Sequence, residues 1–252
     1  MQSDQPRHAR ALVLMVKVPY PGTCKTRLCP PLTPREASSL YGCFLEDLAR
    51  ELPEWKLDAD LVVAWADDDR RAGSLPESAG DEFPEPLELL FGENFIPLRQ
   101  RGVSLTARME SVFETLTARG YASVVMRNSD SPHLPQNTVQ NAFVALEREP
   151  QAVVLGPDLD GGYYLVGIGE GGPHVFPSVM STATVLEQTI ALATKAGRPV
   201  VTLSSQLDID TPEDLITFWL EFGSRADVRQ WATWRELEGH PAWERLTEDE
   251  PG

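Results

Sequence analysis

The stretch "ALVLMVKVPYPGTCKTRL", residues 11–28, gives the first indication of the fold. Residues 11–18 are an apolar run with little polar alternation, which is typical of a strand covered on both faces of a parallel sheet. A Pro/Gly turn carrying Lys25 and Arg27 follows directly. Ligands of open α/β sheets bind beyond the carboxyl ends of the strands, so two cations here suit an anion such as phosphate. The alternative is ordinary surface charge.

Strand-like and helix-like segments alternate along the rest of the chain. Helical patterns lie between most of the strands, and the first begins with Thr33, Pro34 and Glu36, which favour an N-cap and a capping box. This alternation predicts a Rossmann-like three-layer α/β/α sandwich with a mostly parallel sheet. Further strands are expected at residues 59–65, 122–126, 152–155, 163–168 and 199–203, and further helices at 104–120, 137–149, 182–197 and 211–222.

Two segments depart from this pattern. Residues 66–88 are rich in charge, Pro, Gly and Ser, so we expect a surface loop or insertion. Residues 223–252 hold three of the six tryptophans among many charges and end in an acidic tail. We expect a main domain over residues 1–222 and a helical extension over 223–252. The extension would dock on this domain or on a second subunit, so a homodimer is possible.

Composition excludes several classes of partner. The 252 residues carry a net charge of −16, which argues against binding to nucleic acid or to an anionic membrane surface. Cys24, Cys29 and Cys43 form no CxxC pair and are expected to be reduced thiols. No run reaches the roughly 18 apolar residues of a membrane span, and no signal peptide is evident. We therefore expect a cytoplasmic protein.

Acidic residues follow two of the later strands. Asp130 lies in "SDSP", where it could hold Mg²⁺ (or Mn²⁺) or form an Asx-turn or helix cap; the nearby His133 is expected in an exposed loop. Asp208 and Asp210 share one face of an extended segment, and two such carboxylates repel unless a cation or proton lies between them. The alternative is that Asp208 is solvated and Asp210 helps to cap the next helix.

The segment "GPDLDGGYYLVG", residues 156–167, is unusually rich in glycine. Gly161 and Gly162 indicate unusual backbone angles or the close approach of a ligand. Asp158 and Asp160 resemble the start of a calcium loop, but the glycine comes one position early and no Glu closes the loop, so an EF-hand is excluded.

Four stretches together, "PYPGTCKTRL", "NSDSPHLP", "GPDLDGGYYLVGI" and "LDIDTPEDL", resemble the DUF2064 family. These proteins are GT-A-like relatives of the nucleotide-diphospho-sugar transferases and of the phospholactate guanylyltransferases. The resemblance covers most of residues 11–220. It implies a transferase that binds a nucleoside triphosphate or nucleotide sugar at the first loop, with Mg²⁺ or Mn²⁺ as cofactor and a small anionic acceptor.

The resemblance also implies roles for individual residues. The stretch "RQRGVSLTARM" is similar to a further family element near the nucleotide or acceptor. The implied catalytic residues are Lys25, Arg27 and Asp130, and the implied metal ligands are Asp130, Asp208 and Asp210. The nucleotide would contact Lys17, Pro21, Gly22, Thr26, Gln100, Gly102, Arg108 and Ser129. The acceptor would contact Gly156, Asp160, Gly161, Gly162, Ser181 and Thr182.

Three positions depart from the family pattern. Arg127 and Asn128 stand where the family has an apolar residue and Gly, and Met180 stands in place of Trp. Arg127 could add an anion contact or point to solvent. The leading hypothesis is nucleotidyl transfer to a small anionic acceptor with release of pyrophosphate. The alternatives are glycosyl transfer from a nucleotide sugar and a non-catalytic nucleotide-binding or scaffold protein.

Overall fold

A single mixed sheet forms the centre of the molecule. The structure is a computed structural model that describes residues 6–67, 80–180, 182–238 and 240–241, and in these residues the strand order is β3-β2-β1-β4-β6-β5-β7. All neighbours are parallel except β6, which runs antiparallel to β4 and β5. The strands are β1 (Arg10–Lys17), β2 (Asp60–Ala66), β3 (Ile96–Arg99), β4 (Ser123–Arg127), β5 (Val153–Pro157), β6 (Tyr163–Ile168) and β7 (Val200–Thr202).

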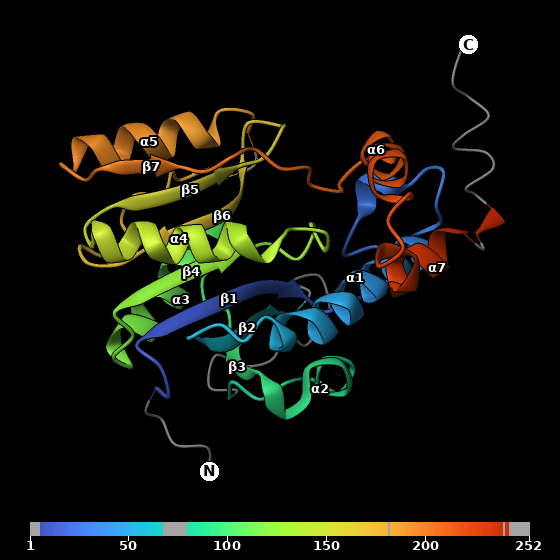
Figure 1. Ribbon diagram of the computed structural model, residues 1–252, viewed down its shortest axis with the longest axis horizontal. Helices are drawn as coiled ribbons and strands as arrows, with labels where there is room; N and C mark the ends of the chain where they lie inside the picture. Colours follow the sequence, from blue (N-terminus) through green and yellow to red (C-terminus); the bar gives the residue numbers. More distant parts are fainter. Residues whose placement is uncertain (1–5, 68–79, 181, 239, 242–252) are drawn as a thin grey trace.

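Helices cover both faces of the sheet and give the three layers that the sequence predicts (Figure 1). The helices α1 (Pro34–Glu54) and α4 (Gln136–Arg148) bury their apolar stripes against one face. The helices α3 (Leu105–Ala118) and α5 (Val185–Lys195) cover the other face. Each face therefore has its own apolar core. The expected Rossmann-like sandwich is confirmed.

The edge strand β3 was missing from the sequence prediction. It is only four residues long and contains Pro97, a residue that sheets accept on edge strands because no ladder hydrogen bond is lost there. The prediction of a loop over residues 66–88 was wrong at its end, because the helix α2 (Glu85–Phe91) begins inside it. Residues 68–79 of that segment lie outside the described residues.

The C-terminal segment docks on the main domain of the same chain. The helix α7 (Ala232–Glu238) packs beside α1, and α6 (Pro212–Phe222) lies above α7 at the right in Figure 1. The buried carboxylate of Asp47 in α1 accepts hydrogen bonds from the backbone N–H groups of Ala232 and Thr233, at 2.8 and 2.9 Å. The rings of Trp219 and Trp234 stack with their centroids 3.7 Å apart. The expected acidic tail lies outside the described residues.

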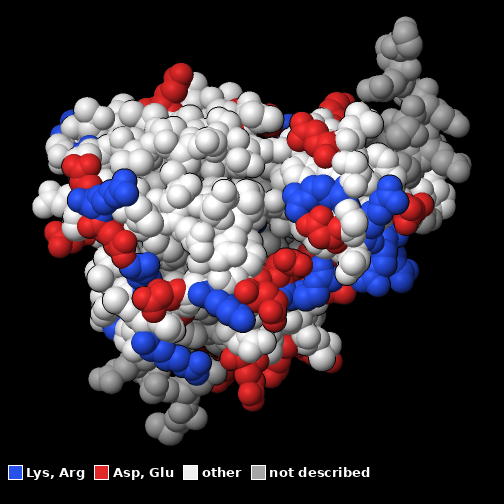
Figure 2. Space-filling view, in the orientation of Figure 1, with Lys and Arg blue, Asp and Glu red and all other residues white. Residues whose placement is uncertain are grey.

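The distribution of surface charge and the lengths of the helices show which kinds of contact the surface can make. Figure 2 shows that Lys and Arg side chains alternate with Asp and Glu along the lower and right edges of this face, around a broad uncharged area. Within the described residues, each helix is too short or too polar to span a membrane. The three cysteines are free thiols, as expected.

Candidate active site

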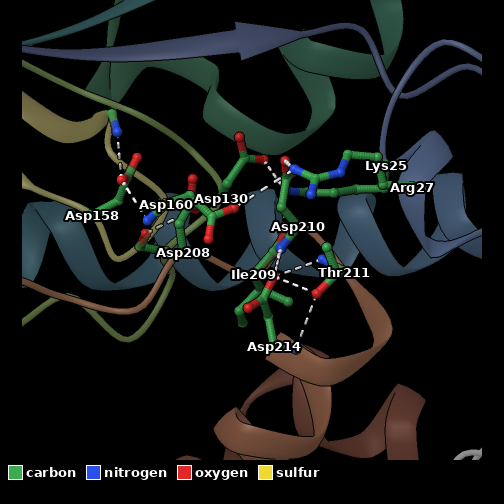
Figure 3. Close-up of polar contacts among 12 residues, drawn as sticks. Lys25, Arg27, Asp130, Asp158, Asp160, Asp208, Ile209, Asp210, Thr211 and Asp214 are labelled. Carbon is green, nitrogen blue, oxygen red and sulfur yellow. Dashed lines mark hydrogen bonds and ion pairs between the residues drawn. The ribbon is translucent and has the colours of Figure 1, made fainter. Parts of the chain in front are cut away.

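A buried lysine among carboxylates is the most unusual feature beyond the strand ends (Figure 3). Lys25 follows β1 in the turn 19–28, where its backbone takes a left-handed conformation with φ of 49°. Its side chain is only 2 % exposed. Its Nζ atom lies 2.6 Å from Asp130, 3.2 Å from Asp210 and 2.6 Å from the carbonyl oxygen of Ile209. The turn, the loop after β4 and the segment before α6 therefore meet at one ammonium group.

Charge dominates burial at this lysine. Burial by itself lowers the pKa of Lys25, but the carboxylates Asp130, Asp208 and Asp210 outweigh it, so the pKa lies above its ordinary value. The ammonium group therefore stays charged at neutral pH. The same carboxylates also face two arginines, Arg27 and Arg127, so the cluster carries charges of both signs.

The two later aspartates of this cluster differ in environment. Burial and the neighbouring Asp130 raise the pKa of Asp208 well above its usual range, against the opposing effect of Lys25, and Asp208 accepts a hydrogen bond from the Ser131 hydroxyl at 3.2 Å. The pKa of Asp210 is lowered, because Lys25 and Arg27 outweigh its burial. Asp210 thus holds the cations of the first loop in place, whereas Asp208 takes up a proton at a higher pH than an ordinary carboxyl group.

Backbone and capping contacts fix the segment 208–210. The N–H of Ile209 donates to the carbonyl of Asp130 at 3.2 Å, which ties the segment to the loop after β4. The cap of α6 is Thr211, which forms a capping box with Asp214. Asp210 is therefore not the cap that the alternative interpretation made it, and its carboxylate is available for Lys25 and Arg27.

Arg127 points neither to solvent nor to a surface anion. It is 1 % exposed at the end of β4, and its guanidinium donates to the carbonyl oxygens of Asn128 and Ser131. Burial lowers its pKa to about 10, and Asp208, Tyr164 and Asp130 oppose that effect. Arg127 therefore braces the loop that carries Asp130.

The expectation of an exposed His133 was wrong. The residue is 4 % exposed, and its ring packs between Phe218 and Phe222 of α6, at centroid distances of 5.4 and 4.7 Å. Burial lowers its pKa to about 3. The docked helix shields the ring from water, so the ring stays neutral. Its packing joins the loop after β4 to α6.

A cavity of about 330 Å³ opens beside the cluster. It lies at the carboxyl ends of β1 and β4 and reaches the first turns of α3 and α5. Eight of the residues that the sequence assigns to the site line it: Lys17, Lys25, Gln100, Arg108, Ser129, Asp130, Gly162 and Asp210. The carboxyl ends of the strands thus bring together residues from five separate loops, from β1 and from α3.

Other predicted residues lie near this cavity without lining it. Arg27 is exposed and bridges Asp210, at 2.9 Å, and Asp160, at 3.8 Å, so it joins the first loop to the glycine-rich loop. Asp208 lies behind Asp130, against Ser131. Ser181 lies outside the described residues. The remaining predicted residues outside the lining are Pro21, Gly22, Thr26, Gly102, Gly156, Gly161 and Thr182.

The glycines of the segment 156–167 are required by the chain itself. A Cβ atom on Gly161, whose φ is 88°, would lie 2.0 Å from the carbonyl oxygen of Ala183. On Gly156 it would meet the ring of Tyr164 at 2.4 Å. The Asp158 carboxylate accepts from the N–H groups of Asp160 and Gly162, at 3.0 and 2.7 Å. The turn is therefore rigid before any ligand arrives.

Sequence reasoning missed several lining residues. Tyr41 lies on the buried face of α1 and was not among the predicted site residues. Its hydroxyl accepts from the N–H of Lys17 at 3.1 Å and lies 2.7 Å from the Ser129 hydroxyl, so it joins β1 to the loop after β4. A buried Tyr hydroxyl needs a polar partner, and that requirement was the available signal. Further missed lining residues are Cys24, Tyr163, Tyr164 and the methionines at positions 15, 109, 126 and 180.

The donor set at the cluster fits a hard divalent cation. Among the described residues, no group of three or more His, Cys, Asp or Glu side chains is arranged to hold a metal ion. Mg²⁺ often takes only one or two carboxylates and completes its octahedral shell with water and substrate phosphates. Asp130 lines the cavity and Asp208 lies behind it, and these are the two carboxylates that could hold the ion. A bound cation would also offset the repulsion that raises the pKa of Asp208.

Comparison with solved structures places this arrangement in a class. A candidate nucleotide-diphospho-sugar transferase from Desulfovibrio desulfuricans G20 is 28 % identical, with a TM-score of 0.80 over 94 % of this chain and 97 % of that chain. A cytidylyltransferase from Leptospira borgpetersenii serovar Hardjo-bovis is 11 % identical, with a TM-score of 0.54 over 98 % and 99 % of the two chains, and shares the fold. Fold and site together define a transferase of the nucleotide-diphospho-sugar transferase type.

The family follows from the sequence itself. Residues 56–182, half of the chain, match the family described as "Uncharacterized protein conserved in bacteria (DUF2064)". The protein belongs to the DUF2064 family, as its motifs indicate. A search of curated proteins gives no match.

Proposed function

We propose that the protein is a metal-dependent nucleotidyltransferase that joins a nucleotide, taken from a nucleoside triphosphate, to a small anionic acceptor. The observation that carries the proposal is the buried Lys25 among Asp130, Asp208 and Asp210, at the mouth of the cavity. Fixed charges of both signs at a strand end suit a triphosphate and its cation. In water they would be screened, but in this half-buried setting they act strongly.

The reaction requires one bond to form and one to break. An oxygen of the acceptor attacks the α-phosphorus, and the bond to the bridging oxygen of pyrophosphate breaks. Mg²⁺ held by Asp130 and Asp208 would neutralise phosphate charge as a Lewis acid. Lys25 and Arg27 stabilise the charge that develops on the phosphates. A phosphate or carboxylate acceptor is already ionised at neutral pH, so no general base is needed.

Thermal unfolding with a panel of nucleotides tests the proposal. The panel holds nucleoside triphosphates and nucleotide sugars, each with Mg²⁺ and with chelator. A ligand at 100 times its Kd adds about 2.7 kcal/mol, a shift of roughly 5–10 °C for a chain of this size. We expect a Mg²⁺-dependent shift with a triphosphate, absent in Lys25→Met and kept in the exposed control Lys195→Met. If no nucleotide shifts the transition, the transferase proposal is wrong and the non-catalytic alternative is favoured.

Glycosyl transfer is the second candidate, and the likeness to the nucleotide-diphospho-sugar transferase type favours it. It would use the same cluster and cation. The products separate the two reactions, because nucleotidyl transfer releases pyrophosphate and glycosyl transfer releases a nucleotide. A shift confined to nucleotide sugars, with release of nucleotide on adding acceptor, would replace the first proposal by the second.

A further inference from the structure

The methionines of this chain are concentrated at one place. The chain has five methionines, and apart from Met1 all of them line the cavity. They come from different parts of the fold: Met15 from β1, Met109 from α3, Met126 from β4 and Met180 from the loop before α5. All four belong to the core on the α3 and α5 face or pack against it. Composition alone does not require such convergence.

Methionine walls have a particular chemistry. The thioether is polarisable and the side chain is unbranched, so such a wall is apolar and adapts to the shape that it contacts. Val166 and Leu105 extend the apolar lining, and the Tyr163 hydroxyl lies 3.9 Å from the Met180 sulfur. A nucleobase edge needs hydrogen-bond partners, but the side-chain N–H₂ of Gln100 already donates to the carbonyls of Val16 and Ala64. The thioethers are at most weak hydrogen-bond acceptors, so the methionine side chains fit an apolar group better than the edge of a base.

Exposed apolar side chains lie close in sequence to the lining residues. Val103, Leu159 and Val179 are 104 %, 67 % and 59 % exposed. Each lies one or two residues from a residue that lines the cavity, in three different loops. An apolar body too long for a cavity of about 330 Å³ would extend among these loops.

Charged side chains line the same cavity. They are Lys17, Lys25, Arg108, Asp130 and Asp210. Resting on the proposed transfer, we propose that the acceptor is an amphiphilic anion: a phosphate or carboxylate attached to an alkyl chain or apolar ring. The anionic group lies beside the cations of the cavity, within reach of the donor phosphates, and the apolar body lies along the four methionines.

Equilibrium binding of alkyl phosphates tests this inference without nucleotide or turnover. The probes are methyl, butyl and hexyl phosphate, measured by calorimetry at fixed pH and salt. Each methylene that becomes buried should tighten binding about fourfold, until the chain leaves the protein. Met180→Gln, which keeps side-chain length and adds polarity, should weaken hexyl phosphate about tenfold and leave methyl phosphate unchanged. Leu89→Gln, on the distant helix α2, is the control for apolar binding elsewhere and should change neither.

Two results would overturn the inference. One is equal affinity for methyl and hexyl phosphate, or equal loss in Met180→Gln and Leu89→Gln. The other is displacement of hexyl phosphate by uncharged nucleosides such as cytidine or guanosine, which would make the cavity a base pocket. Because both use binding of the acceptor probe alone, they leave the nucleotide test of the proposed function independent. Methyl phosphate binding by each variant shows that the variant is folded.

Discussion

Two regions meet at the carboxyl edge of the sheet, and they are built in opposite ways. On the side of α1, α4 and α6, charged groups are fixed by short contacts, as where Lys25 lies 2.6 Å from both Asp130 and the Ile209 carbonyl. On the side of α3 and α5, four methionines line the same cavity together with the apolar side chains of Leu105 and Val166. Electrostatic stabilisation requires charged groups that are fixed at set distances from the substrate, whereas methionine side chains can adapt to the shape of a ligand. The difference suits a fixed donor site beside an adaptable acceptor site.

Loss of the central cation of the charged region, Lys25, should lower the free energy of unfolding more than any other substitution discussed below. In Lys25→Met, Asp130 would lose its ion pair with Lys25 and Asp210 would keep its ion pair with Arg27, so the repulsion among the carboxylates would rise. Removing one partner of a buried ion pair costs about 3–5 kcal/mol, and the partial exposure of the carboxylates puts the loss near the lower end. Urea unfolding at pH 7 measures the loss, with Lys195→Met as control. The deficit should shrink as the pH falls and the carboxylates are protonated; a deficit that stays constant would contradict the charge argument.

Substitution of one glycine in each of two loops compares the loops that border the two regions. Gly22, in the first loop, has φ of 82° and no atom within 4 Å of the point where a Cβ atom would lie, whereas Gly161 has φ of 88° and the Ala183 oxygen 2.0 Å from that point. Gly22→Ala should therefore cost only the left-handed strain of about 1 kcal/mol. Gly161→Ala should cost about 2–4 kcal/mol, because the backbone before α5 must also move. Thermal unfolding of both variants measures this, and equal losses would show that the loop before α5 yields freely.

Most of the secondary structure could be predicted from sequence, because apolar runs and caps are local signals. The direction of β6 was missed although a signal existed. Only five residues separate Pro157 from Tyr163, which suits a hairpin, whereas a parallel crossover needs about a dozen residues or more. The strand β3 was missed because four residues with a central Pro give no periodic pattern.

The candidate site was predicted where the side chains carry charge in loops after strands. Lys25, Asp130 and Asp210 were found that way, and they converge. Burial was not predictable in the same way. His133 and Arg127 lie in polar-looking sequence. His133 is buried against α6, and Arg127 is buried within the loop after β4 that it braces. The convergence of the methionines gave no signal. Met180 was noted only as a departure from the family pattern, and its meeting with the other three methionines depends on tertiary structure.

The buried His133, beside the charged region, should make the stability of the protein depend on pH. The pKa of His133 is lowered to about 3, so the unfolded chain takes up a proton near pH 6.5 that the folded chain refuses. Its contribution is present above pH 6.5 and is lost as the pH falls toward 3. Between pH 6 and 5, wild type should lose about 1 kcal/mol more than His133→Phe.

Urea unfolding at a series of pH values measures that difference. The Phe ring can keep the packing against Phe218 and Phe222, so the variant is expected to fold. The control is His174→Phe, at a side chain that is 73 % exposed, which should keep the steep dependence of wild type. Parallel curves for wild type and His133→Phe would mean that the ring is hydrated in solution.

The smallest effect on stability should come from the exposed cation of the charged region, and it separates stability from function. The side chain of Arg27 is 59 % exposed, and its ion pairs with Asp210 and Asp160 are at the surface. Arg27→Gln should therefore change the free energy of unfolding by about 0–1 kcal/mol.

If Arg27 contacts the developing charge, kcat/KM for the proposed transfer should still fall about tenfold to a hundredfold. Raised salt should weaken binding of triphosphate less in the variant than in wild type, because one screened contact is gone. Unchanged kcat/KM with unchanged stability would leave Arg27 as a surface charge, with Lys25 as the cation that acts on the phosphates.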